Sequence, residues 1–162
     1  MWRKQDNKPC RAIRLRRKGR SMEKKEQQER AGGHQGLQVG LAGKLKIKVT
    51  QEDTARELGS GTLPVLGTPR LLALVEETAW KSVAPFLSEG EGTVGTAVKL
   101  SHLAPTPVGM EATCETKLTE IDRRKLVFSF AVSDEREKVA EGTHERFLIA
   151  EDKFLTKAEG KL

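Results

Sequence analysis

Cysteines, aromatic residues and long apolar runs are all scarce in this chain. Its two cysteines, Cys10 and Cys114, provide neither a disulfide framework nor a metal-ligand motif, so a reducing compartment is the default expectation. No apolar run approaches the roughly 20 residues that cross a bilayer, and no apolar segment follows the basic N-terminus as in a secretory signal. We therefore expect a soluble, cytoplasmic protein without a metal or redox cofactor.

Basic charge is concentrated at the N-terminus. Residues 1–30 hold twelve Lys or Arg against four acids, which leaves a net charge of −2 for the rest of the chain. Residues 1–40 show almost no apolar periodicity and predict a disordered basic tail. Such a tail can bind nucleic acid through its phosphates, although a solvated tail without a partner is the commoner case. A further hypothesis is that translation starts at Met22, because residues 17–21 can be encoded by a purine-rich ribosome-binding site.

From residue 41 the pattern changes to one strand, one helix and four more strands. Residues 44–49 alternate between lysine and apolar side chains, which is typical of a strand with one wet face. Thr68 and Pro69, as N-cap and first helical residue, begin a helix over residues 69–87. Four strands follow, joined by turns that suit antiparallel hairpins, over residues 93–103, 110–121, 125–133 and 139–149. The expected fold is α+β, with one long helix on a five-stranded antiparallel sheet over residues 41–157 and a C-terminal tail over residues 158–162.

Two ionisable residues of this domain stand in apolar surroundings. Glu76 follows residues 71–75, a helical stretch that is apolar on nearly every side and therefore predicts a buried helix. A buried carboxylate is costly unless it is paired, hydrogen-bonded or functional. His102 ends a strand whose alternation places it on an apolar face, together with Val94, Thr96, Val98 and Leu100. An acid and a histidine directed into one apolar interior predict a hydrolytic pair.

His144 also attracts attention, on the strand face opposite Phe147 and Ile149. This placement favours a structural histidine that joins Glu145 and Arg146 in a surface network.

Several strings of the sequence resemble the fluoroacetyl-CoA thioesterase-like branch of the hotdog acyl-CoA thioesterases. They are residues 84–87 (APFL), 90–92 (GEG) leading into 94–96 (VGT), His102 with 104–109 (APTPVG), and 141–146 (EGTHER). The likeness covers residues 42–157. It implies a hotdog fold, hydrolysis of a small or medium acyl-CoA to the free acid and CoA, and a homodimer with its acyl pocket at the subunit interface.

The same resemblance implies a catalytic set of Thr68, Glu76 and His102, with Gly95 close to the bound thioester. Glu76 would activate water or attack the carbonyl itself, His102 would protonate the leaving thiolate, and Thr68 would hold the carboxylate or the substrate. Each also has an ordinary explanation. Thr68 can be an N-cap and Gly95 a bulge or packing glycine. Glu76 can be satisfied by a helix neighbour or by solvent, and His102 can be a hydrogen-bonded core histidine. In a regular helix Thr68 and Glu76 lie about 12 Å apart along the axis. They can serve one site only if the helix starts later or if one of them comes from the partner subunit.

Two features depart from the family pattern. Residues 58–63 (LGSGTL) contain no aromatic residue where fluoroacetate-specific members place a lid over the acyl group. This argues against fluoroacetyl specificity and leaves thioester hydrolysis untouched. The turn after the third strand has Asp122 and Arg123 in place of Asp-Gly, and a positive φ at Arg123 would cost roughly 1 kcal/mol.

Two other classes of function stay open at this point. One is a non-catalytic acyl-CoA-binding module that acts as a sensor, which CoA binding without turnover would support. The other is nucleic-acid binding through the basic tail, which salt-sensitive RNA binding lost on deletion of the tail would support.

Overall fold

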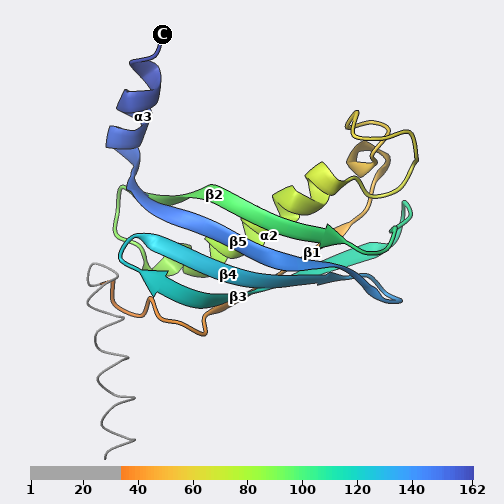
Figure 1. Ribbon diagram of the computed structural model, residues 1–162, viewed down its shortest axis with the longest axis horizontal. Helices are drawn as coiled ribbons and strands as arrows, with labels where there is room; N and C mark the ends of the chain where they lie inside the picture. The colour runs from red at the N-terminus through yellow and green to blue at the C-terminus, as the bar shows by residue number, and fades with distance from the viewer. Residues whose placement is uncertain (1–33) are drawn as a thin grey trace, which may run out of the picture.

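The computed structural model describes residues 34–162, in which one helix lies against a five-stranded antiparallel sheet (Figure 1). The helix α2 spans Thr68–Val83 and continues into the 3-10 turn η2 at Ala84–Phe86, where Pro85 ends the regular helix. The strands are β1 (Ala42–Lys48), β2 (Glu91–His102), β3 (Glu111–Asp122), β4 (Lys125–Ser133) and β5 (Lys138–Ala150). A 3-10 turn η1 (Gln51–Asp53) precedes α2, and a helix α3 (Glu151–Glu159) follows β5. The expected α+β architecture is confirmed.

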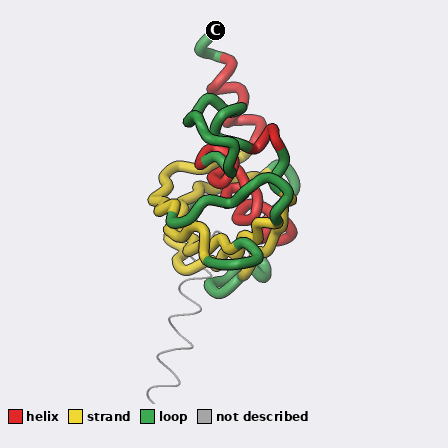
Figure 2. The backbone as a smooth tube through the Cα atoms, turned by 90° about the vertical axis from the view of Figure 1, so that its right-hand side faces the viewer, coloured by secondary structure: helices red, strands yellow, loops and turns green. Residues whose placement is uncertain are grey.

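The strands lie in the order β1-β3-β4-β5-β2, so β1 and β2 form the two edges of the sheet. Side chains alternate as the sequence predicts: the lysines of β1 are exposed, and every second residue of β4 from Leu126 to Val132 is buried. The sheet curves around α2, as the side view shows (Figure 2). The core between them contains Leu71, Leu74 and Val75 of the helix.

A bulge interrupts β2 between Gly95 and Ala97. Before the bulge Gly95 pairs with Arg146, which is buried, whereas after it Ala97 pairs with Glu145 on the other face of the sheet. Directly opposed residues of an antiparallel pair point to the same side. Because of the extra residue in β2, the residues before the bulge lie on the opposite face of the sheet from the one that simple alternation predicts.

The predicted facing of β2 is consequently wrong in part. Val94 pairs with Phe147 and lies with Thr96 on the outer face of the sheet. Val98 pairs with the buried His144, and His102 pairs with Ala140, so the second half of the strand faces α2 as expected. A period-two pattern assumes that every residue of the strand is paired. It therefore cannot reveal a bulge, in which one residue is left unpaired and the alternation shifts.

The folded unit begins earlier than the predicted boundary at residue 41. Leu37 is completely buried in a cluster with Ala79 and Val83 of α2, and Gly36 lies against the ring of Phe86. Residues 34–40 thus belong to the domain. The rest of the predicted basic tail, the proposed start at Met22 and Cys10 lie outside the described residues.

The sequence pattern predicted no helix after the last strand, only a C-terminal tail over residues 158–162. The structure instead has the helix α3 directly after β5. Glu151 and Asp152 in the first turn and Lys157 in the last turn suit the helix dipole. The helix extends away from the sheet and buries none of its residues (Figure 1). Neither α3 nor any other helix of residues 34–162 is long and apolar enough to span a membrane.

The turn between β3 and β4 confirms the expectation for Arg123. Its φ is 55°, and it is the only non-glycine residue with positive φ among residues 34–162. A left-handed arginine carries a cost that glycine would avoid.

Candidate active site

Thr68 and His102 form a pair where α2 begins and β2 ends. The Thr68 hydroxyl lies 2.9 Å from Nδ1 of His102. The predicted N-cap role of Thr68 is wrong, because Gly67 is the N-cap and Thr68 is the first helical residue. Its hydroxyl is therefore free of capping and orients the imidazole instead. Within residues 34–162 the other ring nitrogen, Nε2, is buried and has no hydrogen-bond partner, so it is the ring nitrogen left for a further contact.

The Glu76 carboxylate lies against the backbone of β2 at Gly95. A Cβ on residue 95 would overlap Oε1 of Glu76, so the carboxylate reaches the strand only because residue 95 has no side chain. The predicted burial of Glu76 is wrong for a single chain, since its side chain is 43% exposed. Ala73 and Trp80 on the same side of α2 are exposed as well. The helix is thus buried on one face and open on the face that carries Glu76.

Beneath Glu76, β5 contributes a buried histidine that the sequence pattern had suggested for the surface. His144 is 0% exposed, and its Nδ1 lies 3.1 Å from the carbonyl oxygen of Ala97. A carbonyl only accepts, so Nδ1 carries the proton and Nε2 accepts from Nη1 of Arg146 at 3.1 Å. Burial lowers the pKa of His144, and the positive charge of Arg146 lowers it further. The hydrogen bond to Ala97 and the negative charge of Glu76 oppose this shift and do not outweigh it. Nε2 lies 4.0 Å from Oε1 of Glu76, a contact of a neutral ring with a carboxylate rather than an ion pair.

Arg146 completes this buried network. It is 5% exposed, and it donates from Nε to the Thr93 hydroxyl at 2.9 Å and from Nη2 to the Thr93 carbonyl at 2.7 Å. Burial lowers the pKa of Arg146 and the nearby Glu76 carboxylate opposes that shift. Because a guanidinium stays charged in proteins, Arg146 provides a fixed positive charge next to Glu76.

The surface network expected for His144, Glu145 and Arg146 is therefore wrong, because His144 and Arg146 are buried, although His144 does lie on the strand face opposite Phe147 and Ile149. The alternation of β5 places both on the same face as Leu148, which is buried. Phe147 and Ile149 mark the opposite face with equally apolar side chains. The sequence signal was ambiguous because the interior face of β5 holds polar groups that satisfy one another.

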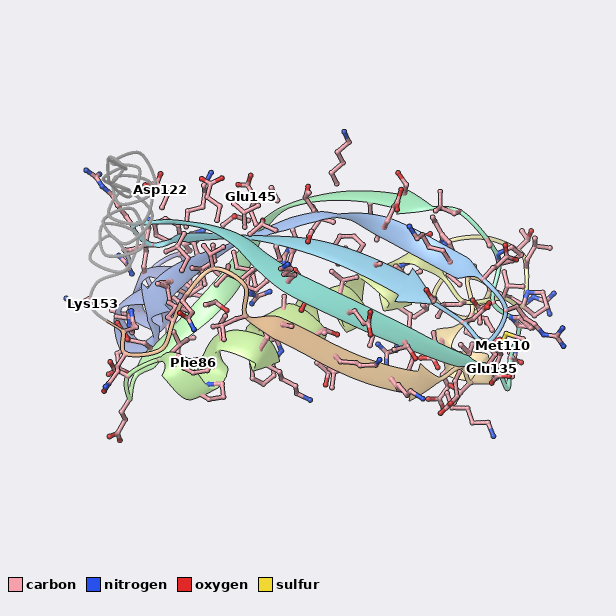
Figure 3. All side chains as sticks on the ribbon, turned by 90° about the horizontal axis from the view of Figure 1, so that it is seen from below. Phe86, Met110, Asp122, Glu135, Glu145 and Lys153 are labelled. Carbon is pink, nitrogen blue, oxygen red and sulfur yellow. The ribbon has the colours of Figure 1, made fainter. Side chains whose placement is uncertain are left out.

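Within one chain, the Thr68–His102 pair lies apart from the cluster around Glu76 and Gly95. α2 starts at Thr68 and does not begin later, so Thr68 and Glu76 stay two turns apart, about 12 Å along the axis. β2 runs from the end of the sheet near Phe86 and Lys153 toward the end near Met110 and Glu135 (Figure 3). His102 closes the strand at the second end, whereas Gly95 lies in its middle.

Thiol and metal chemistry have little support in residues 34–162. Burial raises the pKa of Cys114 to about 11, so this thiol stays protonated in the core. No group of three or more His, Cys, Asp or Glu side chains in these residues could hold a metal ion.

A helix wrapped by a five-stranded antiparallel sheet defines the class of hotdog-fold proteins. A crystal structure of a thioesterase superfamily member from Thermus thermophilus has this fold at 24% identity, covering 77% of this chain and 93% of that chain with a TM-score of 0.71.

The match to one family within this class extends to sequence. The family model for FlK, the fluoroacetyl-CoA-specific thioesterase, matches residues 49–152. The fluoroacetyl-CoA thioesterase of Streptantibioticus cattleyicolor is 34% identical over 97 residues, which are 60% of this chain and 70% of that protein. A solved structure of the fluoroacetyl-CoA thioesterase FlK is 30% identical with a TM-score of 0.75, covering 78% of this chain and 98% of that chain. Variants of FlK have been solved with acetyl-CoA and with fluoroacetate and CoA. The chain belongs to the fluoroacetyl-CoA-specific thioesterase family of acyl-CoA thioester hydrolases, as its motifs had indicated.

Proposed function

We propose that this protein hydrolyses a small or medium acyl-CoA thioester to the free acid and CoA, using Glu76, His102 and Thr68, with Gly95 beside the bound thioester. The observation that carries the proposal is the Glu76 carboxylate resting on the bare backbone of Gly95, next to the charge of Arg146. A catalytic carboxylate needs a fixed position and open access to substrate, and this arrangement provides both.

Two routes suit a carboxylate in this position. In the first, Glu76 takes a proton from water as the water oxygen attacks the thioester carbonyl. In the second, a Glu76 oxygen attacks the carbonyl to form an anhydride that water then hydrolyses. In both, the carbon–sulfur bond breaks and His102 protonates the departing CoA thiolate, while Thr68 orients the imidazole through Nδ1. Backbone N–H groups near Gly95 are candidates for stabilising the developing oxyanion.

The separation of the two clusters leads to a composite site in a homodimer. β2 is an edge strand with exposed residues at positions 95–99, and such an edge is a template for pairing with another chain. Two β2 strands that pair antiparallel about a two-fold axis at Lys99, with the extra residue of the bulge left unpaired, place Gly95 opposite the partner's His102 on the same face. Glu76 of one protomer would then act together with the partner's Thr68 and the partner's His102.

We do not expect the enzyme to be specific for fluoroacetyl-CoA over other acyl-CoAs. The loop before α2 carries exposed Leu58 and Leu63 and no aromatic side chain in residues 58–63. Aliphatic side chains in this loop suit an ordinary acyl group, because they offer apolar contact without a rigid aromatic cover.

The test is release of CoA from a panel of acyl-CoAs, short to long and including fluoroacetyl-CoA, by the wild type, Glu76→Gln and Glu77→Gln. Glu77 is the matched control, since it is the neighbouring residue and pairs with Lys81. We expect turnover of at least one substrate, a loss of about 10²- to 10⁴-fold in Glu76→Gln, and little change in Glu77→Gln. CoA binding with no turnover across the panel would favour the sensor function instead. Full activity of Glu76→Gln would retain the thioesterase and discard the role of Glu76.

A further inference from the structure

A groove of about 400 Å³ lies beside the C-terminal end of α2. Its helix wall consists of Trp80, Ala84 and Leu87, and the facing wall includes Thr93 of β2 and Arg146 of β5. One side of the groove is therefore apolar, and the other is hydrogen-bonded and polar.

The groove and the Glu76 carboxylate share their walls. Trp80 lies one turn after Glu76 on the same side of α2. Thr93 and Gly95 both face α2, and Arg146 pairs with Gly95 while it holds Thr93 through Nε. A thioester carbonyl positioned at Glu76 thus has the groove directly next to it.

We propose that this groove binds the acyl chain of the substrate and selects a neutral aliphatic chain of medium length. The inference rests on the proposed thioesterase function and names the substrate class of the same site. Trp80 is 42% exposed, and Ala84 and Leu87 are half-buried, so an aliphatic chain would remove apolar surface from water on both partners. The small side chain of Ala84 leaves the groove open beyond Trp80.

Charge at the far end of the groove opposes a dicarboxylic acyl group. Glu91 and Glu151 line that end, and the hydrogen bond with His34 lowers the pKa of Glu91. Because His34 pairs with Glu91, the charge that a terminal carboxylate on the acyl chain would meet is chiefly that of Glu151. Arg146 does not offset it, because its bonds to Thr93 and His144 hold it at the Glu76 end.

Trp80 makes occupancy of the groove directly measurable, since the chain has only one other tryptophan, Trp2. In a Trp2→Phe protein, we expect the non-hydrolysable thioether analogue of hexanoyl-CoA to shift the Trp80 emission to shorter wavelength. CoA alone should not shift it. Each added methylene from the acetyl to the hexanoyl analogue should tighten binding by up to about fourfold. Tight binding of the hexanoyl analogue without any change in Trp80 emission would overturn the proposal.

Kinetics provide the second test, with Ala84→Leu to shorten the groove and Ala158→Leu on the exposed α3 as the control. Ala84→Leu should lower kcat/KM for hexanoyl-CoA at least about tenfold and leave acetyl-CoA within about twofold, because a filled pocket excludes only the longer chain. The wild type should prefer hexanoyl-CoA to adipoyl-CoA, which has the same number of carbons and a terminal carboxylate. Hydrolysis of acetyl-CoA without a gain for longer chains, or a preference for adipoyl-CoA, would overturn the groove assignment and leave the thioesterase. No hydrolysis of any acyl-CoA by the wild type would overturn both.

Discussion

The carboxylate of Glu76 occupies the space that a side chain at Gly95 would need. This relationship joins α2 to the edge strand at the point where β2 bulges, and it holds the acid beside Arg146.

Replacing Gly95 by alanine should displace Glu76 and lower kcat about 10²-fold, since a shift of roughly 1 Å at a reacting group has that effect. The measurement is CoA release, with thermal unfolding to confirm that the protein is folded. Thr96→Ala is the control on the same strand, because Thr96 lies on the outer face of the sheet, away from Glu76. Equal activity of the two variants would contradict the close contact.

The Thr68 hydroxyl is expected to matter through His102 rather than through the helix. Thr68→Val removes the hydrogen bond to Nδ1 and keeps the shape of the side chain, so kcat should fall about 10- to 100-fold. Thr68→Ser keeps the hydroxyl and should retain most of the activity. Both should melt close to the wild type, as Thr68 is exposed and Gly67 caps the helix. A large loss in the serine variant as well would show that the hydroxyl is not the group that matters.

Mixing two inactive variants distinguishes a composite site from a site within one chain. Glu76→Gln and His102→Gln homodimers should each be inactive. After unfolding and refolding together, a composite site predicts about a quarter of wild-type activity, because half of the dimers are mixed and one of their two sites is intact. If the site lay within one chain, every site would carry a defect and the mixture would stay inactive. Monomeric protein in sedimentation experiments would contradict the dimer itself.

The buried, neutral His144 should make stability fall in mild acid. Its pKa is lowered in the folded state, chiefly by burial, whereas the unfolded chain takes up the proton near the ordinary value of 6.5. Its contribution is therefore complete above that pH and decreases as the pH falls below it. His144→Asn keeps a donor for the Ala97 carbonyl and cannot titrate. Its free energy of unfolding should be lower at neutral pH but should change less between pH 7 and pH 5 than that of the wild type. Parallel curves for both proteins would argue against the neutral ring.

Arg123→Gly should stabilise the protein by roughly 0.5–1 kcal/mol, because it relieves a left-handed arginine at φ 55°. Arg124→Gly, in the same turn without a positive φ, is the control and should not stabilise. Chemical denaturation of both variants measures the difference, and a destabilised Arg123→Gly would show that the side chain contributes contacts that outweigh the strain.

Most of the fold follows from local patterns in the sequence. The alternation in residues 44–49 and 126–132 predicts strands with one buried face, and β1 and β4 have that form. The short motifs were sufficient to identify the family, because they are the segments where backbone geometry and chemistry restrict the residue type. The exposed helix α3 was missed, since its nine residues follow directly on β5 and bury nothing.

The site was only partly predictable. Sequence likeness named Thr68, Glu76, His102 and Gly95. The apolar and alternating patterns of the sequence predicted a buried Glu76 and a His144 at the surface, whereas Glu76 is 43% exposed and His144 is buried. Burial depends on which neighbours a chain brings to each face, and a single helix or strand does not contain that information. The polar pair His144 and Arg146 is stable inside because each satisfies the other.

Sequence alone was enough to give the order of the elements, the residues that could carry the chemistry and a spacing of about 12 Å between Thr68 and Glu76. The contacts of Thr68 with His102, and of Glu76 with Gly95 over His144 and Arg146, became visible only in the folded chain. The bulge after Gly95 and the packing of α2 on the sheet set these contacts, and both depend on strands that are distant in sequence.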